Sequence, residues 1–216
     1  MTDRPLELLA GALSATVCDA LDSLGLRSQA LDPAIRPLWR GAQLVGRAMP
    51  IVVSCQEAMP DDPYVGEMDA LDALSAGEVP VFEIAAESRA AAWGELFSCA
   101  AIGLGAVGVV CDGLVRDARQ IEELGFPTFA RGCSPLDTLG RAVVTSYGQS
   151  ALCGGVRVAR GDLIVADADG VVAVPSAVMD HVATAVIDKR KLEAGAREDL
   201  LNGMTIRAVW EKYQVF

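Results

Sequence analysis

The sequence contains a single histidine, His181, among its 216 residues. One histidine excludes serine–histidine triads and metal sites with several imidazole ligands within one chain. His181 follows Asp180 in a segment with the pattern of a helix, and we expect it at the surface and not in a catalytic role. Acid–base chemistry in this protein must therefore use carboxylates, water or metal-bound water.

Further absences bear on the compartment. The six cysteines form no Cys-x-x-Cys pair and no zinc-like spacing. Several of them lie within apolar runs, which favours reduced, buried thiols. The first residues lack the apolar core of a signal peptide, and charges or glycines interrupt every apolar run before it reaches membrane-spanning length. We expect a soluble, cytoplasmic protein that does not act at a membrane.

Aromatic residues are also few, at 5% of the chain, although 52% of the residues are hydrophobic. The core must therefore be built from Ala, Val, Leu and Ile. Eighteen basic residues against 29 acidic ones give a formal charge of −11, and no block of Lys and Arg interrupts this balance. The charge argues against nucleic-acid binding through phosphate neutralisation. A carboxylate ligand would need a local cation or a metal.

The pattern of the chain predicts a single α/β domain, residues 1–216, with a mixed sheet and a helical C-terminal arm. A capped helix is expected from Ser14 to near Gly25, Asp169-Gly170 is typical of a hairpin, and Ser176 and Thr205 can cap two final helices. The other predicted helices are 68–76, 118–124 and 93–103, the last apolar nearly all round and therefore buried. The predicted strands are 43–46, 50–53, 79–84, 107–111, 127–130, 155–158, 162–167 and 170–174.

The most informative stretch of the chain runs from Gly105 to Asp117. An apolar run that suits a buried strand ends in Asp112-Gly113, and Arg116-Asp117 follows. Loops at strand ends are where α/β proteins place ligand-handling groups. Arg116 offers a planar fork for a carboxylate, and Asp117 offers a hard oxygen ligand for a divalent cation. The alternative is a solvated ion pair, or a helix start capped by the aspartate.

Gly94-Glu95-Leu96 is predicted to begin the apolar helix, with free backbone amides that can bind a carboxylate. Gly94 would let a substrate approach the main chain closely. The alternative is that Gly94 merely begins a helix packed in the core. Glu95 is acidic on an otherwise apolar helix and needs a partner, either a basic side chain or a metal-bound water.

Two further acids are weaker candidates. The position of Asp112 directly before a glycine is typical of a turn residue. Glu193 shares one face of the C-terminal helix with Val182 and Val186, and this apolar stripe needs a second surface to cover it. The alternative is that Glu193 is simply solvated near the end of the helix.

Six segments together resemble the RraA-like family, which contains 4-hydroxy-4-methyl-2-oxoglutarate aldolase and the ribonuclease E activity regulator A. The resemblance covers nearly the whole chain and implies a layered β/β/α sandwich with a mixed central sheet. It fails between Met59 and Glu67, where the loop Pro60–Pro63 has no clear family counterpart. The matching segments are Ser14–Leu21, Ala34–Leu38, Trp93–Leu96, Gly108–Asp117, Leu124–Gly132 and Gly161–Pro175.

The resemblance implies a lyase, a divalent-metal-dependent (class II) pyruvate aldolase. Its substrates would be 4-hydroxy-2-oxo acids such as 4-hydroxy-4-methyl-2-oxoglutarate, with oxaloacetate decarboxylation as a side activity. Cleavage leaves negative charge on the enolate oxygen of pyruvate, which a Lewis acid stabilises. Mg²⁺ or Mn²⁺ keeps several waters and can be held by one carboxylate, Asp117.

The remaining roles follow from the same resemblance. Arg116 would hold the pyruvyl oxygens, Gly94, Glu95 and Leu96 would bind substrate, and Glu95 would hold a metal-bound water. Family members assemble as trimers or paired trimers with active sites between subunits. We therefore expect a homotrimer or homohexamer in which Glu193 acts from a neighbouring chain.

Two alternatives concern the function. The regulator branch of the family binds a ribonuclease or another protein without turnover, although Arg116, Asp117 and Glu95 weigh against this. A methyltransferase would need a glycine-rich nucleotide fingerprint followed by an acidic residue, and we find none.

Overall fold

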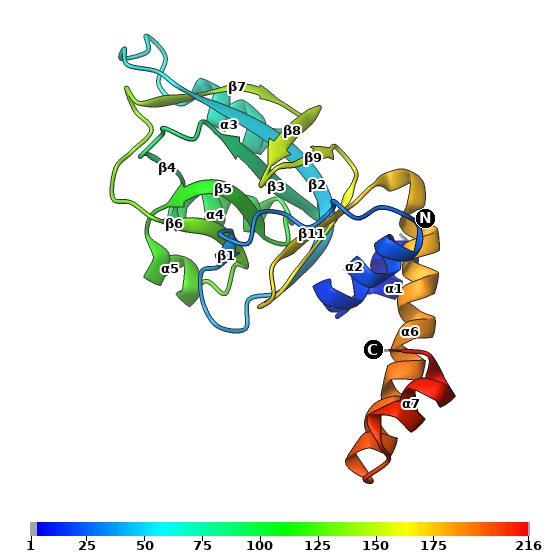
Figure 1. Ribbon diagram of the computed structural model, residues 1–216. Coiled ribbons are helices and arrows are strands. Elements are labelled where there is room, and N and C mark those ends of the chain that lie inside the picture. Colours follow the sequence, from blue (N-terminus) through cyan, green and yellow to red (C-terminus); the bar gives the residue numbers. More distant parts are fainter. Residues whose placement is uncertain (1–3, 216) are drawn as a thin grey trace.

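The computed structural model describes residues 4–215. A mixed sheet forms the body of the protein, and two C-terminal helices extend from it as an arm (Figure 1). The helices are α1 (Arg4–Leu9), α2 (Ser14–Ser23), α3 (Val65–Asp72), α4 (Glu95–Gly103), α5 (Ala118–Glu123), α6 (Met179–Leu201) and α7 (Ile206–Tyr213), with a 3-10 turn, η1 (Ser176–Val178). The strands are β1 (Arg36–Pro37), β2 (Leu44–Cys55), β3 (Glu78–Ile84), β4 (Ala91–Trp93), β5 (Val109–Val115), β6 (Thr128–Cys133), β7 (Ala142–Tyr147), β8 (Ser150–Cys153), β9 (Val156–Ala159), β10 (Leu163–Ala166) and β11 (Val171–Val174).

The main sheet has nine strands, with β1-β6-β5-β3-β2-β10-β11 as its path, β4 paired with β5 and β7 paired with β2. The pairs β2/β3, β3/β5, β4/β5 and β5/β6 are parallel and the others antiparallel. The ribbon β8–β9 forms a separate antiparallel pair. The parallel pairs place the carboxyl ends of β3, β4, β5 and β6 at one edge of the sheet, where ligand sites of α/β proteins lie.

Successive residues of the central strands face two different layers, as the pleat of a strand requires. Val110 faces the β8–β9 ribbon through a core that includes Val158, whereas Cys111 faces the helices through a core that includes Leu71 and Ile121. The predicted fold class, a layered β/β/α arrangement with a mixed sheet and a helical arm, is confirmed.

Several predicted boundaries are wrong. The two short strands 43–46 and 50–53 form one long strand, β2. Asp112-Gly113 does not end a strand but lies inside β5. Trp93 belongs to β4, so α4 begins only at Glu95. The strands β1, β4, β7 and β8 had no clear sequence signal.

Asp167, in the turn between β10 and β11, holds the start of α2. Its carboxylate accepts hydrogen bonds from the Ser14 N–H (2.8 Å) and the Ser14 hydroxyl (2.6 Å). Ser14 is therefore bound by a distant residue, and its side chain does not cap α2 as predicted. The Asp169-Gly170 hairpin is confirmed. Thr205 caps α7 as predicted, accepting from the Ala208 N–H at 3.3 Å, whereas Ser176 begins η1 and does not cap α6.

The apolar stripe of α6 is covered within the chain. Val182 and Val186 are fully buried in a cluster with Leu9 of α1 and Val17 of α2. The premise that this stripe needs a second subunit is therefore wrong, because α1 and α2 already cover it.

The helix α4 shows the opposite discrepancy. Only Ser98 and Ala101 of this apolar helix are buried, so the prediction of a buried helix is wrong. Leu96 is 77% exposed, and Ile102 and the adjoining Leu104 are exposed too. Exposed apolar side chains grouped on one element mark a contact surface.

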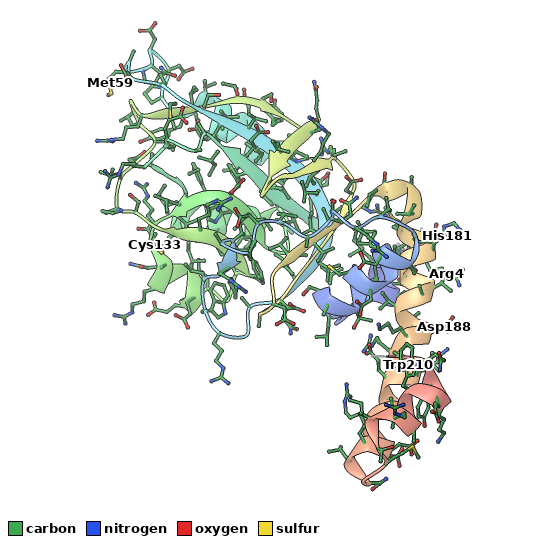
Figure 2. All side chains as sticks on the ribbon, viewed as in Figure 1. Arg4, Met59, Cys133, His181, Asp188 and Trp210 are labelled. Atoms are coloured by element: carbon green, nitrogen blue, oxygen red, sulfur yellow. The ribbon has the colours of Figure 1, made fainter. Side chains whose placement is uncertain are left out.

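The expected surface position of His181 is confirmed, and Figure 2 shows its side chain on α6. Cys111 and Cys153 are buried, and burial raises the pKa of both thiols. Cys55, Cys99 and Cys133 are exposed, so the expectation of buried thiols is wrong for these three. Within residues 4–215, no helix combines the length and the apolar character needed to span a membrane.

Candidate active site

Two strand ends meet at the candidate site. β4 runs parallel to β5, and the Arg116 N–H after β5 donates to the Trp93 carbonyl at the end of β4 (2.9 Å). This pairing brings Gly94 and Glu95 beside Arg116 and Asp117. All four residues, together with Leu96, line one cavity of about 510 Å³. The structure therefore groups the residues that the sequence analysis assigned to substrate and metal, apart from Glu193.

Asp117 links the two strand ends. Its Oδ2 accepts from the Glu95 N–H at 3.2 Å and lies 3.6 Å from Arg116 Nε. The residue occupies the N-cap position of α5 but makes no side-chain hydrogen bond to that helix. Its φ of 57° lies in the left-handed region, which costs about 1 kcal/mol for a residue with a side chain. Such strain concentrates at functional sites, and here it directs the carboxylate toward α4 instead of α5.

A glycine is required at position 94 because a side chain there would collide with neighbouring atoms. Its φ of −160° is ordinary extended backbone, but a Cβ there would lie 2.7 Å from Asp117 Oδ2 and 3.0 Å from Arg116 Cγ. The turn is fixed from inside by two hydrogen bonds. Trp93 Nε1 donates to Ser98 Oγ (2.8 Å), and the Ser98 hydroxyl donates to the Gly94 carbonyl (3.0 Å). Gly94 thus does more than begin a helix, because it leaves room for the Arg116–Asp117 pair.

We expect Gly94→Ala to displace Asp117 and to lower any activity of this site by about 10²-fold, the cost of small misplacements in a preorganised site. Gly103→Ala is the matched control, because it changes the other end of α4, where an added Cβ meets no atom within 4 Å. Steady-state kinetics and thermal unfolding of both variants check the prediction. Equal activity in the two variants would contradict the proposed crowding.

Asp137 and Tyr64 complete the site and were missed by the sequence analysis. Arg116 Nη1 donates to Asp137 Oδ2 at 2.7 Å, and the Tyr64 hydroxyl donates to Asp137 Oδ1 at 3.2 Å. Partial burial disfavours the charged carboxyl of Asp137, but hydrogen bonds from the Leu139 N–H and Arg116 prevail and lower its pKa. The hydrogen bond to Asp137 in turn raises the pKa of Arg116. The network keeps Arg116 cationic and oriented toward the cavity.

Glu67 of α3 lies next to this network and is only 7% exposed. Burial raises the pKa of the Glu67 carboxyl above its usual value of 4.5, and the charge of Asp137 adds to the rise, against an opposing hydrogen bond from Thr138. The native carboxyl therefore holds its proton to higher pH than the unfolded one. Its contribution to stability is full below pH 4.5 and is lost as the pH rises through the raised pKa.

We expect Glu67→Gln to remove this loss, because the amide has a similar shape and no charge. Above the raised pKa the variant should be more stable than the wild type, with about 2–4 °C in Tm for each kcal/mol in a domain of this size. Glu57→Gln, at an exposed position, is the matched control. Tm measured from about pH 4 to pH 8, roughly the range in which a carboxyl with a raised pKa titrates, checks the prediction. Parallel curves for wild type and Glu67→Gln would contradict it.

The donor set fits a hard divalent cation held largely by water. Among residues 4–215, no three His, Cys, Asp or Glu side chains are grouped so as to hold a metal. The Asp117 side chain is 38% exposed and lines the main cavity and a second one of about 430 Å³. Mg²⁺ commonly binds through one or two carboxylates and several waters. Asp117 can fill that role, and the half-buried Glu95 carboxylate lines the same cavity.

Asp112 is not at the site. Its carboxylate forms an ion pair with Arg131 and accepts from the Gly154 N–H at 2.7 Å. Arg131 also pairs with Asp32 at 2.9 Å. Asp112 therefore ties β5 to β6 and to the turn between β8 and β9, and the interpretation as a simple turn residue is wrong.

Glu193 does not meet the other candidates within one chain. It lies on α6, which Figure 1 shows on the opposite side of the molecule from α4 and β4. Its Oε1 is 3.9 Å from Lys189 Nζ, and it lines a different cavity with Thr16, Arg190 and Arg197. A role at the Arg116–Asp117 site requires a second copy of the chain.

The sheet edge and its arginine–aspartate pair define an α/β protein with a candidate small-ligand site at the carboxyl ends of parallel strands. The family model described as RraA-like, Aldolase/RraA, matches residues 14–173, and the chain belongs to this family. The resemblance found in the sequence is thereby confirmed.

Three known proteins are similar to this chain. A protein of Halalkalibacterium halodurans named "Putative 4-hydroxy-4-methyl-2-oxoglutarate aldolase" is 33% identical over 201 residues, covering 91% of this chain and 89% of the relative. The crystal structure of Streptomyces coelicolor RraAS2, described as an unusual member of the RNase ES inhibitor RraA protein family, matches with 26% identity and a TM-score of 0.80, covering 91% and 97% of the two chains. An uncharacterized protein of Pseudomonas syringae pv. tomato matches with 25% identity and a TM-score of 0.88, covering 99% and 95%.

Proposed function

We propose that the protein is a divalent-metal-dependent lyase that cleaves a 4-hydroxy-2-oxo acid to pyruvate. The single observation that carries this proposal is the meeting of Gly94-Glu95 with Arg116-Asp117 at one cavity. The site combines a cation for a carboxylate, a carboxylate for a metal and a second carboxylate for proton transfer. The naming of the Halalkalibacterium halodurans relative as an aldolase adds support.

Each residue of the candidate site has a definite task in this proposal. Arg116, held by Asp137 at 2.7 Å, binds the pyruvyl oxygens and offsets charge that develops on them. Gly94 leaves room for the Arg116–Asp117 pair beside the backbone, and Gly94 and Leu96 line the same cavity as substrate-binding residues. Asp117 also lines the second cavity, which has room for the waters that a bound Mg²⁺ would keep.

The metal supplies a Lewis acid for the enolate charge when it is bound at Asp117. The carbon–carbon bond breaks as the proton leaves the 4-hydroxyl group, and its electrons pass to the pyruvate enolate. Glu95 receives that proton through a water molecule and returns it to C3, which yields pyruvate and a carbonyl compound. Oxaloacetate decarboxylation passes through the same enolate and is proposed as a side activity.

The working unit is proposed to be a homotrimer or homohexamer in which Glu193 reaches the site of a neighbour. Two observations support an assembly of this kind. Leu96 lines the cavity and is one of the exposed apolar residues of α4, and α6, which carries Glu193, lies on the opposite side of the molecule from α4 (Figure 1). A ring of identical chains can bring Glu193 to the site of a neighbour.

A regulatory role is the second candidate, since the exposed face of α4 could also bind another protein. The strained Asp117 and the Arg116–Asp137 pair favour the enzyme, because a docking surface needs neither. Protein treated with a chelator should lose pyruvate production from 4-hydroxy-2-oxo acids and regain it with Mg²⁺ or Mn²⁺. Full activity after complete chelation would refute the metal dependence. Absence of pyruvate production from every substrate tested would favour the regulatory role.

A further inference from the structure

The face of α6 that carries Glu193 also carries two arginines. Arg190 precedes Glu193 by three residues and Arg197 follows it by four, so the three side chains lie on one face of the helix, within about two turns. All three line one cavity of about 390 Å³, together with residues before and at the start of α2. The other lining residues are Gly11, Leu13, Thr16 and Ala194.

Arg190 and Arg197 are available to a ligand. Both are exposed, and the side chain of neither makes an ion pair or a hydrogen bond with any residue from 4 to 215. The adjacent Lys189 differs, because its ammonium group lies 2.8 Å from Asp19 Oδ2. Two guanidinium groups that share a cavity and have no carboxylate partner can bind an anion.

The cavity of Arg116 and Asp117 has the opposite balance of charge. Glu95, Asp117 and Asp137 line it, and Arg116 is the only basic residue among its described lining residues. When α6 brings Glu193 to this cavity of a neighbouring chain, as proposed for the homotrimer or homohexamer, the two arginines beside Glu193 arrive with it. An acidic cavity and a cationic helix face are electrostatically complementary. This complementarity supports a second copy of the chain as the partner of the face.

We propose that Arg190 and Arg197 of a neighbouring chain bind the distal carboxylate of the substrate. The inference rests on the proposed function and adds the residues that select a substrate with two carboxylates. Arg116 and the metal hold the 2-oxo acid end, so the arginines of the neighbour hold the other end. A methyl group in place of the distal carboxylate would leave both guanidinium groups without a ligand. The arrangement is compatible with oxaloacetate, which also carries two carboxylates.

Two unreactive ligands of equal chain length, 2-oxoglutarate and 2-oxopentanoate, test the proposal by calorimetric titration of the Mg²⁺-loaded protein. They differ only in the distal group, which is a carboxylate or a methyl group, and both lack the 4-hydroxyl group needed for cleavage. We expect the wild type to bind 2-oxoglutarate at least about tenfold tighter, the effect of hydrogen bonds to a charged group. Equal affinities, tighter binding of 2-oxopentanoate, or binding of neither ligand would overturn the inference. Failure of the proposed function has a different signature, namely preferential binding of 2-oxoglutarate without pyruvate release from any 4-hydroxy-2-oxo acid.

The double variant Arg190→Ala/Arg197→Ala should weaken the binding of 2-oxoglutarate about tenfold or more and leave that of 2-oxopentanoate unchanged. Arg119→Ala/Arg207→Ala is the matched control, because it removes two exposed arginines that line neither cavity. A merely structural role of Arg190 and Arg197 would weaken both ligands equally. That result, an unchanged ratio of the two dissociation constants, or the same shift in the control would overturn the inference.

Subunit exchange tests whether the arginines come from a neighbour. Asp117→Ala protein keeps both arginines but lacks the proposed metal ligand, whereas the double variant Arg190→Ala/Arg197→Ala keeps Asp117. In randomly mixed oligomers, roughly a quarter of the sites combine an intact Asp117 with intact arginines of a neighbour. Tight binding of 2-oxoglutarate should therefore reappear at about this fraction of the sites. Mixtures that exchange subunits and show no tight sites would overturn the inference.

Discussion

Asp117→Ala should abolish the metal response of pyruvate production, and Arg116→Ala should lower kcat/KM by about 10²–10³. The two effects differ in kind because Asp117 is the proposed metal ligand and Arg116 the proposed ligand of the substrate. Asp117 also accepts the Glu95 N–H at 3.2 Å, so its loss additionally loosens the start of α4. Arg116→Lys should rescue little, because an ammonium group cannot reproduce a planar fork that is bound to Asp137 on one side.

The controls use the same substitutions at exposed positions. Arg119→Ala removes an arginine from α5 that pairs with Glu123 at the surface, and Asp188→Ala removes an aspartate from α6 (Figure 2). Steady-state kinetics over a range of Mg²⁺ concentrations separate the roles of Asp117 and Arg116. Near-normal kcat/KM in both site variants, with the controls also active, would mean that the pair is only structural.

Glu193→Ala and Asp117→Ala proteins should each be nearly inactive, and mixed oligomers of the two should recover activity. The physical reason is that a site built from two chains is intact wherever an intact Asp117 meets a neighbour's intact Glu193. In randomly mixed rings this holds for roughly a quarter of the sites. The measurement is pyruvate production after subunit exchange, with exchange confirmed separately.

The single-variant proteins mixed without exchange serve as the control for this experiment. Sedimentation that shows an active monomer would contradict the shared site. So would mixed oligomers that exchange subunits and recover nothing. The Glu193 side chain is 28% exposed, and its Oε1 lies 3.9 Å from Lys189 Nζ. The carboxylate is therefore accessible to a neighbour.

The sequence was sufficient to predict the mixed α/β fold and the core of the site. The alternation of strands and helices between Val79 and Ala130 was predictable from the spacing of the apolar residues and the length of each apolar run. The grouping of Gly94 with Arg116 came from the family resemblance, because β4, which ends directly before Gly94, had no clear sequence signal. The register of β5 was not predictable in the same way. Asp112-Gly113 has the composition of a turn, but Gly113 packs against Ile84 and Asp112 pairs with Arg131, so tertiary contacts keep the segment in a strand.

Asp137 was missed because it meets Tyr64 across 73 residues and Arg116 across 21 residues of sequence. One signal was present, since Asp137 follows β6, the parallel neighbour of β5, and therefore lies at the same edge of the sheet. The environments of α4 and α6 could not be read from the sequence at all. Both helices carry apolar faces, but only the fold decides that α1 and α2 cover α6 while Leu96 of α4 stays exposed.

Exchange of the C3 protons of pyruvate with deuterium, followed by proton NMR, tests the central claim most directly. Every cleavage proposed for this site passes through the pyruvate enolate, so the experiment requires no knowledge of the leaving group. The account predicts that the Mg²⁺-loaded protein exchanges the methyl protons well above the buffer rate. It also predicts the buffer rate after chelation and in Asp117→Ala protein. Exchange at the buffer rate by the folded, Mg²⁺-loaded wild type would contradict the account.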